Sequence, residues 1–335
     1  MNNVIGESVL HITTCCSHHC DFCYAIDDQK PHIHQDYSIL LKIIEELSKV
    51  GCKSILFVGG DPASHPRSVD LARAAKSFGM ETGILSNTLF FENYSAVDAM
   101  SAFDNIEATI HSGTPQLHDN FCKKDGAYNF VIKNLKALKS PNTHLGIAYN
   151  ITPNTYDSIE STIKKIIEVD NVPIDHVVFQ RIVSVGRAYG KSNWELSVEF
   201  LKSIFSQIER IQNTFNINIS FEDTFPLCVV PNQYKHYIHP CSWGWTSISV
   251  DMYGNVAKCC TDPNYTLGNI LEVSLVELWR KSTALIERRS GKNIPQSCHD
   301  CMQFAHCCGG CILSSEMNGG NGDSLLLDIT KKRVK

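Results

Sequence analysis

The stretch TTCCSHHCDFCYA, residues 13–25, combines cysteines and histidines densely enough to suggest a metal site. Cys16, Cys20 and Cys23 have the spacing Cys-x3-Cys-x2-Cys, and they follow an apolar run that predicts a β-strand. Thiolates are the usual ligands of iron-sulfur clusters, and three thiolates leave one iron open to a substrate or cofactor. A zinc site is the alternative, because His18 or His19 could supply a fourth ligand.

The composition is that of an ordinary globular protein: 43% of the 335 residues are apolar, 19% are charged, and the formal net charge is −5. This charge gives no electrostatic reason to expect a nucleic-acid partner. We find neither a signal peptide nor an apolar run long enough to span a membrane, so we expect a cytoplasmic protein with no membrane partner. The cysteine count, fifteen, is odd, and in a reducing compartment regularly spaced cysteines favour cluster or metal ligation over disulfides.

The elements that must position the cysteine stretch alternate along the chain. Apolar β-rich runs separated by amphipathic helices predict βα units around a parallel sheet. The expected strands are 8–13, 54–60, 81–87, 105–112, 144–151 and 176–182. The expected helices are 36–50, 67–78, 92–103, 126–139, 155–169 and 194–214. Six units are too few for a closed eight-unit barrel, so we expect an α/β fold with a partial (β/α)6 TIM-like barrel, whose chemistry lies at the carboxyl ends of the strands.

The character of the sequence changes after NINISFEDTFPL, residues 216–227. Many of the remaining cysteines fall between positions 241 and 311, among tryptophans and glycine-rich turns. This pattern favours a second, small domain held together by metal. We therefore expect a barrel domain over residues 1–222 and a cysteine-rich domain over residues 223–335.

The Cys-x3-Cys-x2-Cys stretch, with Phe22 just before its last cysteine, resembles the signature of radical S-adenosylmethionine (radical SAM) enzymes. A second stretch, VGGDP at 58–62, follows the second expected strand and resembles the Gly-Gly-Glu-Pro motif of that family, with Asp61 in place of glutamate. The resemblance implies a [4Fe-4S] cluster on the three cysteines, with S-adenosylmethionine (SAM) bound at the open iron. It also implies reductive cleavage of SAM to a 5′-deoxyadenosyl radical that abstracts hydrogen from a substrate.

The same resemblance implies a set of SAM-binding residues at the ends of the strands. The GGDP stretch would meet the SAM amine, and two aromatic residues of the cysteine stretch would lie beside the adenine. Polar groups after the third, fourth and fifth strands would serve the ribose and carboxylate. The expected SAM-binding residues are Phe22, Tyr24, Gly59, Gly60, Asp61, Pro62, Ser86, Asn87, His111, Ser112 and Asn150.

The later cysteines resemble the SPASM domain of radical SAM enzymes, which holds auxiliary iron-sulfur clusters. Their pattern is Cys-x12-Gly-x4-Cys, a gap, and then Cys-x2-Cys-x5-Cys-x3-Cys. The stretches LGNILEVSLVELWR (267–280) and VSVGRA (183–188) resemble the family as well. By this resemblance a distal cluster would be held by Cys298, Cys301 and Cys307, and a proximal cluster by Cys241, Cys259 and Cys311, with Cys228 as a candidate fourth ligand of the proximal cluster.

The tail after the last of these cysteines departs from the family, because a full SPASM domain has one further cysteine there. Asp323 or Asp328 could supply an oxygen ligand to the distal cluster instead, or that site could stay open. Two auxiliary clusters are therefore expected, and one is the alternative. The spacing also allows a structural zinc ribbon made by the last four cysteines of the pattern.

Cys260 directly follows a proposed cluster ligand, at a position that lies near the substrate in SPASM enzymes. A thiol there could return a hydrogen atom to a carbon radical, as in radical SAM peptide epimerases, so we expect Cys260 to be catalytic. The alternatives are a further cluster ligand or a packed thiol. The other unassigned cysteines, Cys15, Cys52, Cys122 and Cys308, are expected to be mostly small core residues.

Three functions fit these features. The first is a radical SAM enzyme that crosslinks, oxidises or epimerises a ribosomally synthesised peptide, and it leads because the appended domain is nearly complete. The second is a dehydrogenase or rearrangement enzyme for a small molecule such as an aminoglycoside or nucleoside sugar. The third, a non-catalytic iron-sulfur binding protein, has no use for the glycine-rich SAM motif. Expected partners are a reductant such as flavodoxin or ferredoxin and a separate peptide-recognition protein.

Overall fold

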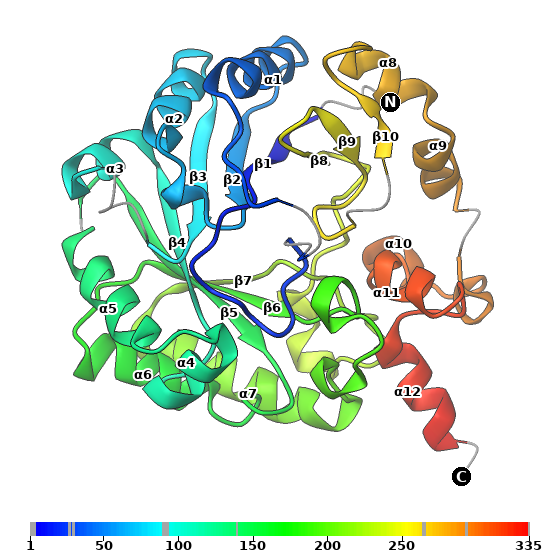
Figure 1. The fold of residues 1–335 in the computed structure, drawn as a ribbon. Helices are drawn as coiled ribbons and strands as arrows, with labels where there is room; N and C mark the ends of the chain where they lie inside the picture. Colours follow the sequence, from blue (N-terminus) through cyan, green and yellow to red (C-terminus); the bar gives the residue numbers. More distant parts are fainter. Residues whose placement is uncertain are drawn as a thin grey trace.

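A curved sheet of ten strands forms the centre of the protein, in the order β10-β9-β8-β1-β2-β3-β4-β5-β6-β7 (Figure 1). The computed structural model describes residues 5–25, 28, 31–88, 94–138, 140–262, 266–291 and 294–333. The strands are β1 Glu7–Thr13, β2 Ser54–Gly59, β3 Glu81–Ser86, β4 Asn105–Ile110, β5 His144–Ile151, β6 His176–Arg181, β7 Asn218–Phe221, β8 Ser247–Val250, β9 Asn255–Ala257 and β10 Thr266–Asn269. The helices are α1 Tyr37–Lys49, α2 Ser68–Ser77, α3 Ala96–Ala102, α4 Pro115–Cys122, α5 Ala127–Ala137, α6 Ile159–Lys164, α7 Val198–Phe215, α8 Leu275–Lys281, α9 Thr283–Ser290, α10 Phe304–Cys307, α11 Ile312–Met317 and α12 Ser324–Arg333.

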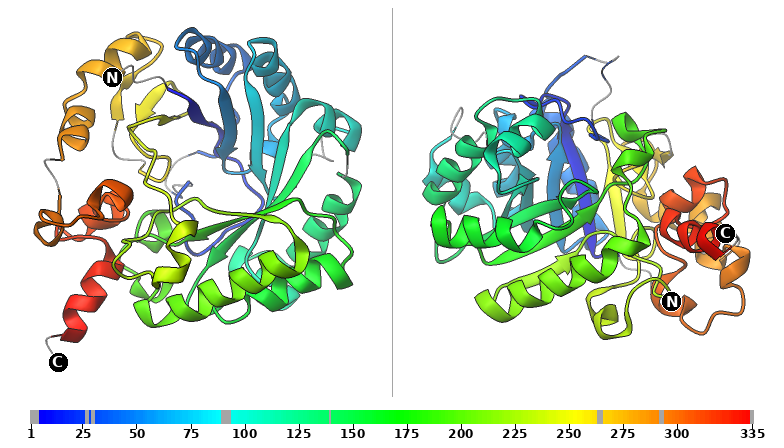
Figure 2. Two further views of the ribbon diagram at one scale, coloured as in Figure 1. Left: turned by 180° about the vertical axis from the view of Figure 1, so that it is seen from behind. Right: turned by 90° about the horizontal axis from the view of Figure 1, so that it is seen from below.

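The six predicted βα units are confirmed by the first part of this sheet, where β1 to β6 run parallel and in sequence order. Helices α1 to α7 cover its outer face (Figures 1 and 2). In β1, Leu10 and Ile12 are fully buried and pack in one apolar core with Leu40 and Ile43 of α1. Because side chains alternate along a strand, Glu7, Val9, His11 and Thr13 of β1 face the barrel interior. The fold is therefore an α/β partial barrel with a distinct inner surface.

Two short parallel strands extend the sheet beyond the six predicted units. β7 pairs with β6, and β8 pairs with β1 in the register Glu7↔Ser247. Each has four residues, which is too short for a readable alternation of apolar and polar side chains. β8 lies beyond the expected domain boundary at residue 222, so the cysteine-rich part of the chain continues the sheet of the barrel.

The helical layer also contains an element that the sequence analysis did not predict. α4 precedes the expected fourth helix, which is α5, and it begins with Pro115 directly after Thr114, a common start for a helix. The expected helix 92–103 begins outside the described residues, and its described part is α3. No helix in the described part of the chain is long and apolar enough to cross a membrane.

The carboxy-terminal helices α8 to α12 lie on one side of the barrel, with α8 beside β10 and α12 against α7 (Figures 1 and 2). Side-chain contacts, two of which follow, attach the carboxy-terminal part of the chain to the barrel. Arg181 of β6 forms a buried ion pair with Asp323, with Nη1 and Oδ1 2.9 Å apart. Gln35 Nε2 donates to the carbonyl oxygen of Met252 at 2.8 Å.

Candidate cluster and cofactor site

The cysteine loop, residues 14–25 after β1, crosses the carboxyl ends of the barrel strands (Figure 1). Backbone hydrogen bonds fix it to three other elements. The amide of Asp61 donates to Cys15 O at 2.7 Å, and the amide of His19 donates to Cys122 O, at the end of α4, at 2.8 Å. The amide of Arg187 donates to Cys23 O at 2.9 Å. The loop that carries the three expected cluster ligands is therefore held from several sides.

Gly59 and Gly60 allow the second motif to approach this loop closely. A Cβ atom on Gly59, whose φ is +135°, would lie 2.3 Å from Thr13 O, and one on Gly60 would lie 2.3 Å from Cys15 O. The amide of Gly60 also donates to Thr13 O at 2.8 Å. Only glycine has room at such an approach. The two motifs that the sequence analysis found separately thus form one hydrogen-bonded unit.

Asp61 is fully buried at the edge of this unit. Its Oδ1 atom accepts hydrogen bonds from Ser86 Oγ at 2.6 Å and from the amide of Ala63 at 3.1 Å. Its Oδ2 atom has no hydrogen-bond partner among the described residues. Burial raises the pKa of the Asp61 carboxyl to about 6. A buried oxygen without a partner is costly, and this one is available to a donor such as the amine of a ligand.

The sulfur of Cys16 lies among nitrogen donors. It accepts hydrogen bonds from Asn87 Nδ2 and from the amide of His18, each at 3.4 Å. Burial raises the pKa of the Cys16 thiol well above its ordinary value, and a coordinating metal would deprotonate it. Donors aimed at a cysteine sulfur are typical of groups that orient and tune a cluster ligand.

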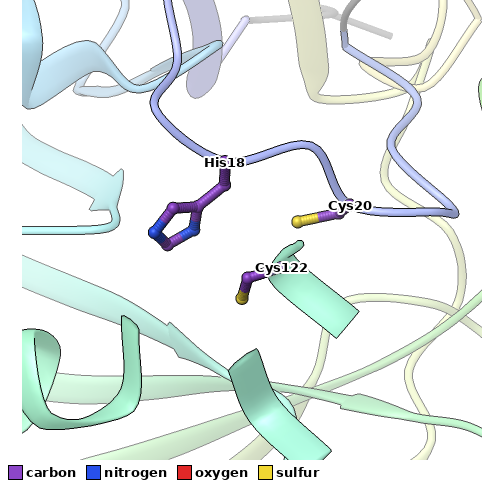
Figure 3. A group of neighbouring side chains, drawn as sticks. All are labelled: His18, Cys20 and Cys122. Carbon is purple, nitrogen blue, oxygen red and sulfur yellow. The ribbon is translucent and has the colours of Figure 1, made fainter. Parts of the chain in front are cut away.

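A second arrangement involves Cys20. His18, Cys20 and Cys122 form the one group of three or more histidine, cysteine or carboxylate side chains, among the residues described, whose ligand atoms all lie within 4.8 Å of one another (Figure 3). His18 Nδ1 is buried and has no hydrogen-bond partner within the described part of the chain. Such a group could hold a single metal ion, which would compete with a cluster for Cys20. Cys122 was expected to be a core residue, and its place beside the loop depends on α4, which the sequence did not reveal.

The residues expected beside the adenine and ribose come together only in part. The ring of Phe22 packs edge-on against His111 and Trp194, with both pairs of centroids 5.0 Å apart. Asn150 Nδ2 lies 3.4 Å from His111 Nδ1. Ser112 Oγ instead accepts from the amide of Thr114 at 3.0 Å, at the start of α4.

Tyr24 and Cys260 lie on the barrel interior, where the cysteine loop faces the carboxy-terminal part. Burial raises the pKa of the Tyr24 phenol, and the nearby Cys260 raises it further. Cys260 also shares a hydrogen bond with the Cys259 thiol, and this bond and burial raise the pKa of Cys260. Burial likewise raises the pKa of Glu222 to about 8. The sequence analysis missed Glu222, although two adjacent carboxylates in the apolar run FEDTF were a usable signal.

The structure places Cys228 near the distal cysteines, whereas the sequence analysis assigned it to the proximal set. The charges that act on Cys228 are those of Cys307, Cys298 and Cys301. Its neighbours Leu227 and Val229 share an apolar core with Cys307. Cys308, in turn, acts electrostatically on Cys241 of the proximal set.

The two aspartates considered as distal ligands are engaged elsewhere. Asp323 pairs through both oxygens with Arg181 and accepts from the amide of Cys311 at 2.7 Å. Asp328 Oδ2 accepts from Ser197 Oγ and the amide of Val198, at the start of α7. The four cysteines of the alternative zinc ribbon all belong to the described residues. No three of their sulfur atoms lie within 4.8 Å of one another.

Comparison with known proteins agrees with the two resemblances. Residues 10–166 match the Radical SAM superfamily, and residues 241–302 match the SPASM iron-sulfur cluster-binding domain. The chain is 24% identical over 280 residues to the PqqA peptide cyclase of Ruegeria pomeroyi, which covers 81% of this chain and 72% of that protein. It is 20% identical over 322 residues to an AdoMet-dependent heme synthase of Oleidesulfovibrio alaskensis, with coverage of 90% and 80%.

The fold is also found in a solved structure. Streptococcus suis SuiB bound to its precursor peptide SuiA superposes with a TM-score of 0.76 at 16% identity, over 92% of this chain and 72% of that chain. The matched domains imply [4Fe-4S] clusters and SAM. Three features fit these groups: the buried Oδ2 of Asp61, which can accept a hydrogen bond, the close approach of Gly59 and Gly60 to the cysteine loop, and the nitrogen donors around the Cys16 sulfur. The chain therefore carries a radical SAM domain followed by a SPASM iron-sulfur cluster-binding domain.

Proposed function

We propose that this protein is an enzyme that modifies a ribosomally synthesised peptide by hydrogen abstraction, with a crosslink, an oxidised side chain or an inverted α-carbon as product. When bound, a reduced [4Fe-4S] cluster on Cys16, Cys20 and Cys23 supplies the electron that cleaves SAM to a 5′-deoxyadenosyl radical. The observation that carries the radical chemistry is the hydrogen bond from Asp61 N to Cys15 O, which joins the cysteine loop to the GGDP stretch.

The residues of the chain then have separable roles in holding SAM. Asp61 Oδ2 would accept a hydrogen bond from the amine of SAM, while Ser86 Oγ donates a hydrogen bond to Oδ1, the other oxygen of the carboxylate. Asn87 would hold the sulfur of Cys16 in place. Phe22 and His111 would form a buried wall that keeps water from the reacting atoms, which protects radicals from side reactions.

Cys260 is the proposed hydrogen donor to the substrate radical. Its position supports this role, because Cys260 and Tyr24 of the cysteine loop pack against the same apolar cluster, which includes Val9 of β1. Donation of a hydrogen atom by the thiol would leave the peptide composition unchanged and invert the α-carbon, and an electron from the proposed reductant with a proton would convert the resulting thiyl radical back to the thiol. Removal of an electron and a proton instead would give an oxidised product.

Peptide modification is supported by the similarity to a PqqA peptide cyclase and by the shared fold with SuiB, which was solved with its precursor peptide. The heme synthase relative supports the second candidate, a dehydrogenase or rearrangement enzyme for a small molecule. In both cases we propose flavodoxin or ferredoxin as electron donor. For a peptide we also propose a separate recognition protein.

The test is anaerobic co-expression in heavy water with any short peptide encoded beside this protein, followed by mass spectrometry of the peptide. A loss of two hydrogens would indicate oxidation or crosslinking, and deuterium at an α-carbon with otherwise unchanged composition would indicate epimerisation. An unmodified peptide, with 5′-deoxyadenosine formed only when a metabolite extract is added, would favour the small-molecule candidate.

A further inference from the structure

A cavity of about 530 Å³ occupies the amino-terminal half of the barrel interior, at the end opposite the cysteine loop. Its walls come from the first residues of β1 to β4, from Phe221 at the end of β7 with Glu222 and Thr224 after it, from residues 239–243 and from Ser247 of β8. Cys241, an expected ligand of the proximal cluster, is one of the wall residues. No role is proposed above for the other wall residues.

Four carboxylates line the cavity, and the wall residues include no lysine or arginine: they are Glu7, Glu81, Glu107 and Glu222. Three of them have neutral or weakly basic partners. Ser247 Oγ donates to Glu7 at 3.0 Å, Asn105 Nδ2 donates to Glu81 at 2.7 Å, and His176 Nε2 lies 3.2 Å from Glu107. The negative charge of the cavity is therefore not balanced by a full positive charge from its own walls.

Thr224 supplies an independent sign of a ligand. Thr224 is one of the wall residues of the same cavity and is only 6% exposed, yet its Oγ1 has no hydrogen-bond partner among the described residues. A buried hydroxyl without a partner costs about 1–3 kcal/mol, and a donor from a bound molecule would remove this cost. Burial, and then the charges of Asp223 and Glu107, raise the pKa of Glu222 to about 8, which indicates a site where added positive charge is favourable.

The spacing of the carboxylates favours an organic cation over a metal ion. Among the described residues, only His18, Cys20 and Cys122 bring three ligand atoms within 4.8 Å of one another, so the cavity carboxylates do not converge on one point. Phe221 and Trp243 add aromatic side chains to the walls, and such faces attract ammonium and guanidinium groups.

We infer that this cavity binds an ammonium or guanidinium group of the substrate, with Glu107 and Glu222 as its charge partners and Thr224 Oγ1 as a hydrogen-bond acceptor. The inference deepens the proposed function and rests on it. Val9 and Trp243 of the cavity wall belong to the apolar cluster against which Tyr24 and Cys260 pack, so the cavity adjoins the proposed site of chemistry.

The length of β1 indicates what kind of substrate can reach both places. From Glu7 beside the cavity to Thr13 at the cysteine loop, a strand rises about 20 Å at roughly 3.3 Å per residue. An extended peptide covers that distance in about six residues. The basic side chain, lysine or arginine, would therefore lie within about six residues of the modified position. An amino sugar could supply the same cationic group from a small molecule.

The experiment measures binding by calorimetry to the anaerobically reconstituted protein with SAM present. The probes are acetyl-Gly-Gly-Lys-Gly-Gly-amide, its norleucine counterpart, kanamycin and calcium chloride. We expect the lysine peptide to bind and the norleucine peptide to bind about tenfold more weakly or not at all. The double variant Glu107→Gln/Glu222→Gln should lose this preference, and the exposed control Glu272→Gln should keep it.

Thr224→Val gives a second variant that removes only the unpartnered hydroxyl, so it should fold at least as stably as the wild type while it weakens binding of the lysine peptide. If kanamycin binds and the lysine peptide does not, the result would support a subsite for a cationic group and contradict a peptide as its ligand. Equal binding of the lysine and norleucine peptides with no kanamycin binding, or binding of calcium alone, would overturn the inference even if the co-expressed peptide is modified.

Discussion

Arg181, at the end of β6, and Asp323, just before α12, form an ion pair whose side chains are 2% and 0% exposed. The same carboxylate accepts a hydrogen bond from the amide of Cys311. One buried aspartate thus connects the barrel to a proposed ligand of the proximal cluster. The position of the SPASM cysteines relative to the barrel depends on this contact.

Asp323→Asn should destabilise the protein by about 3–5 kcal/mol, because it leaves the guanidinium of Arg181 buried without a negative partner. The double variant Arg181→Met/Asp323→Leu removes both charges and should lose much less. Urea unfolding of the two variants and the wild type measures the difference. Equal loss in the single and double variants would contradict a role for the charge pair itself.

Gly60→Ala should prevent SAM binding, because the added Cβ would lie 2.3 Å from the backbone oxygen of Cys15. The matched control is Gly6→Ala, whose Cβ would lie 3.9 Å from its nearest neighbour, Thr246 O. Equilibrium binding of SAM to the reconstituted proteins gives the comparison. Wild-type affinity in Gly60→Ala would show that the close approach of the two motifs is not required.

Cys228→Ser should lower the iron content and alter the electron paramagnetic resonance signal of one auxiliary cluster, since Cys228 lies near Cys298, Cys301 and Cys307. Cys52→Ser, at a buried site beside Ser8 and Ser54, serves as the control and should keep the full iron content. If both variants retain the same iron and the same signals, Cys228 is not a cluster ligand.

Stability should fall below pH 6.5 because His118 is buried in its neutral form. Burial lowers the pKa of His118 from 6.5 to about 4. Folding therefore favours the neutral ring, and this contribution is fully present above pH 6.5 and is lost as the pH falls toward 4. Between pH 7.5 and pH 5 the wild type should lose about 2 kcal/mol more than His118→Asn.

Thermal or urea unfolding at the two pH values checks this expectation. His32→Asn, at an exposed position, is the control and should follow the wild type. A His118→Asn variant with the same pH dependence as the wild type would contradict the assignment to this ring.

The fold and the centre of the site could be predicted because their signals are local. Cys16, Cys20 and Cys23 fall within one loop, and GGDP directly follows a strand, so spacing and context were enough to pair them. Other parts depend on contacts between distant segments. Cys122 approaches Cys20 only because α4 ends there. Cys228 lies near the distal cysteines and not the proximal ones because its neighbours Leu227 and Val229 share an apolar core with Cys307.

The acidic cavity could not be predicted for a related reason. Its four carboxylates come from the first residues of β1, β3 and β4 and from the segment after β7, and each alone is an ordinary polar residue near one end of a strand. The register of the parallel strands brings them to one interior. β8, which helps to shape that interior, is too short to recognise from its sequence.

The most direct test of the account is the release of 5′-deoxyadenosine from SAM by the anaerobically reconstituted and reduced protein, measured by liquid chromatography and mass spectrometry. The account predicts release by the wild type and none by Cys16→Ala, Cys20→Ala or Cys23→Ala, while Cys52→Ala retains activity. No release by a wild type that binds iron and SAM, or equal release by Cys16→Ala, would contradict it.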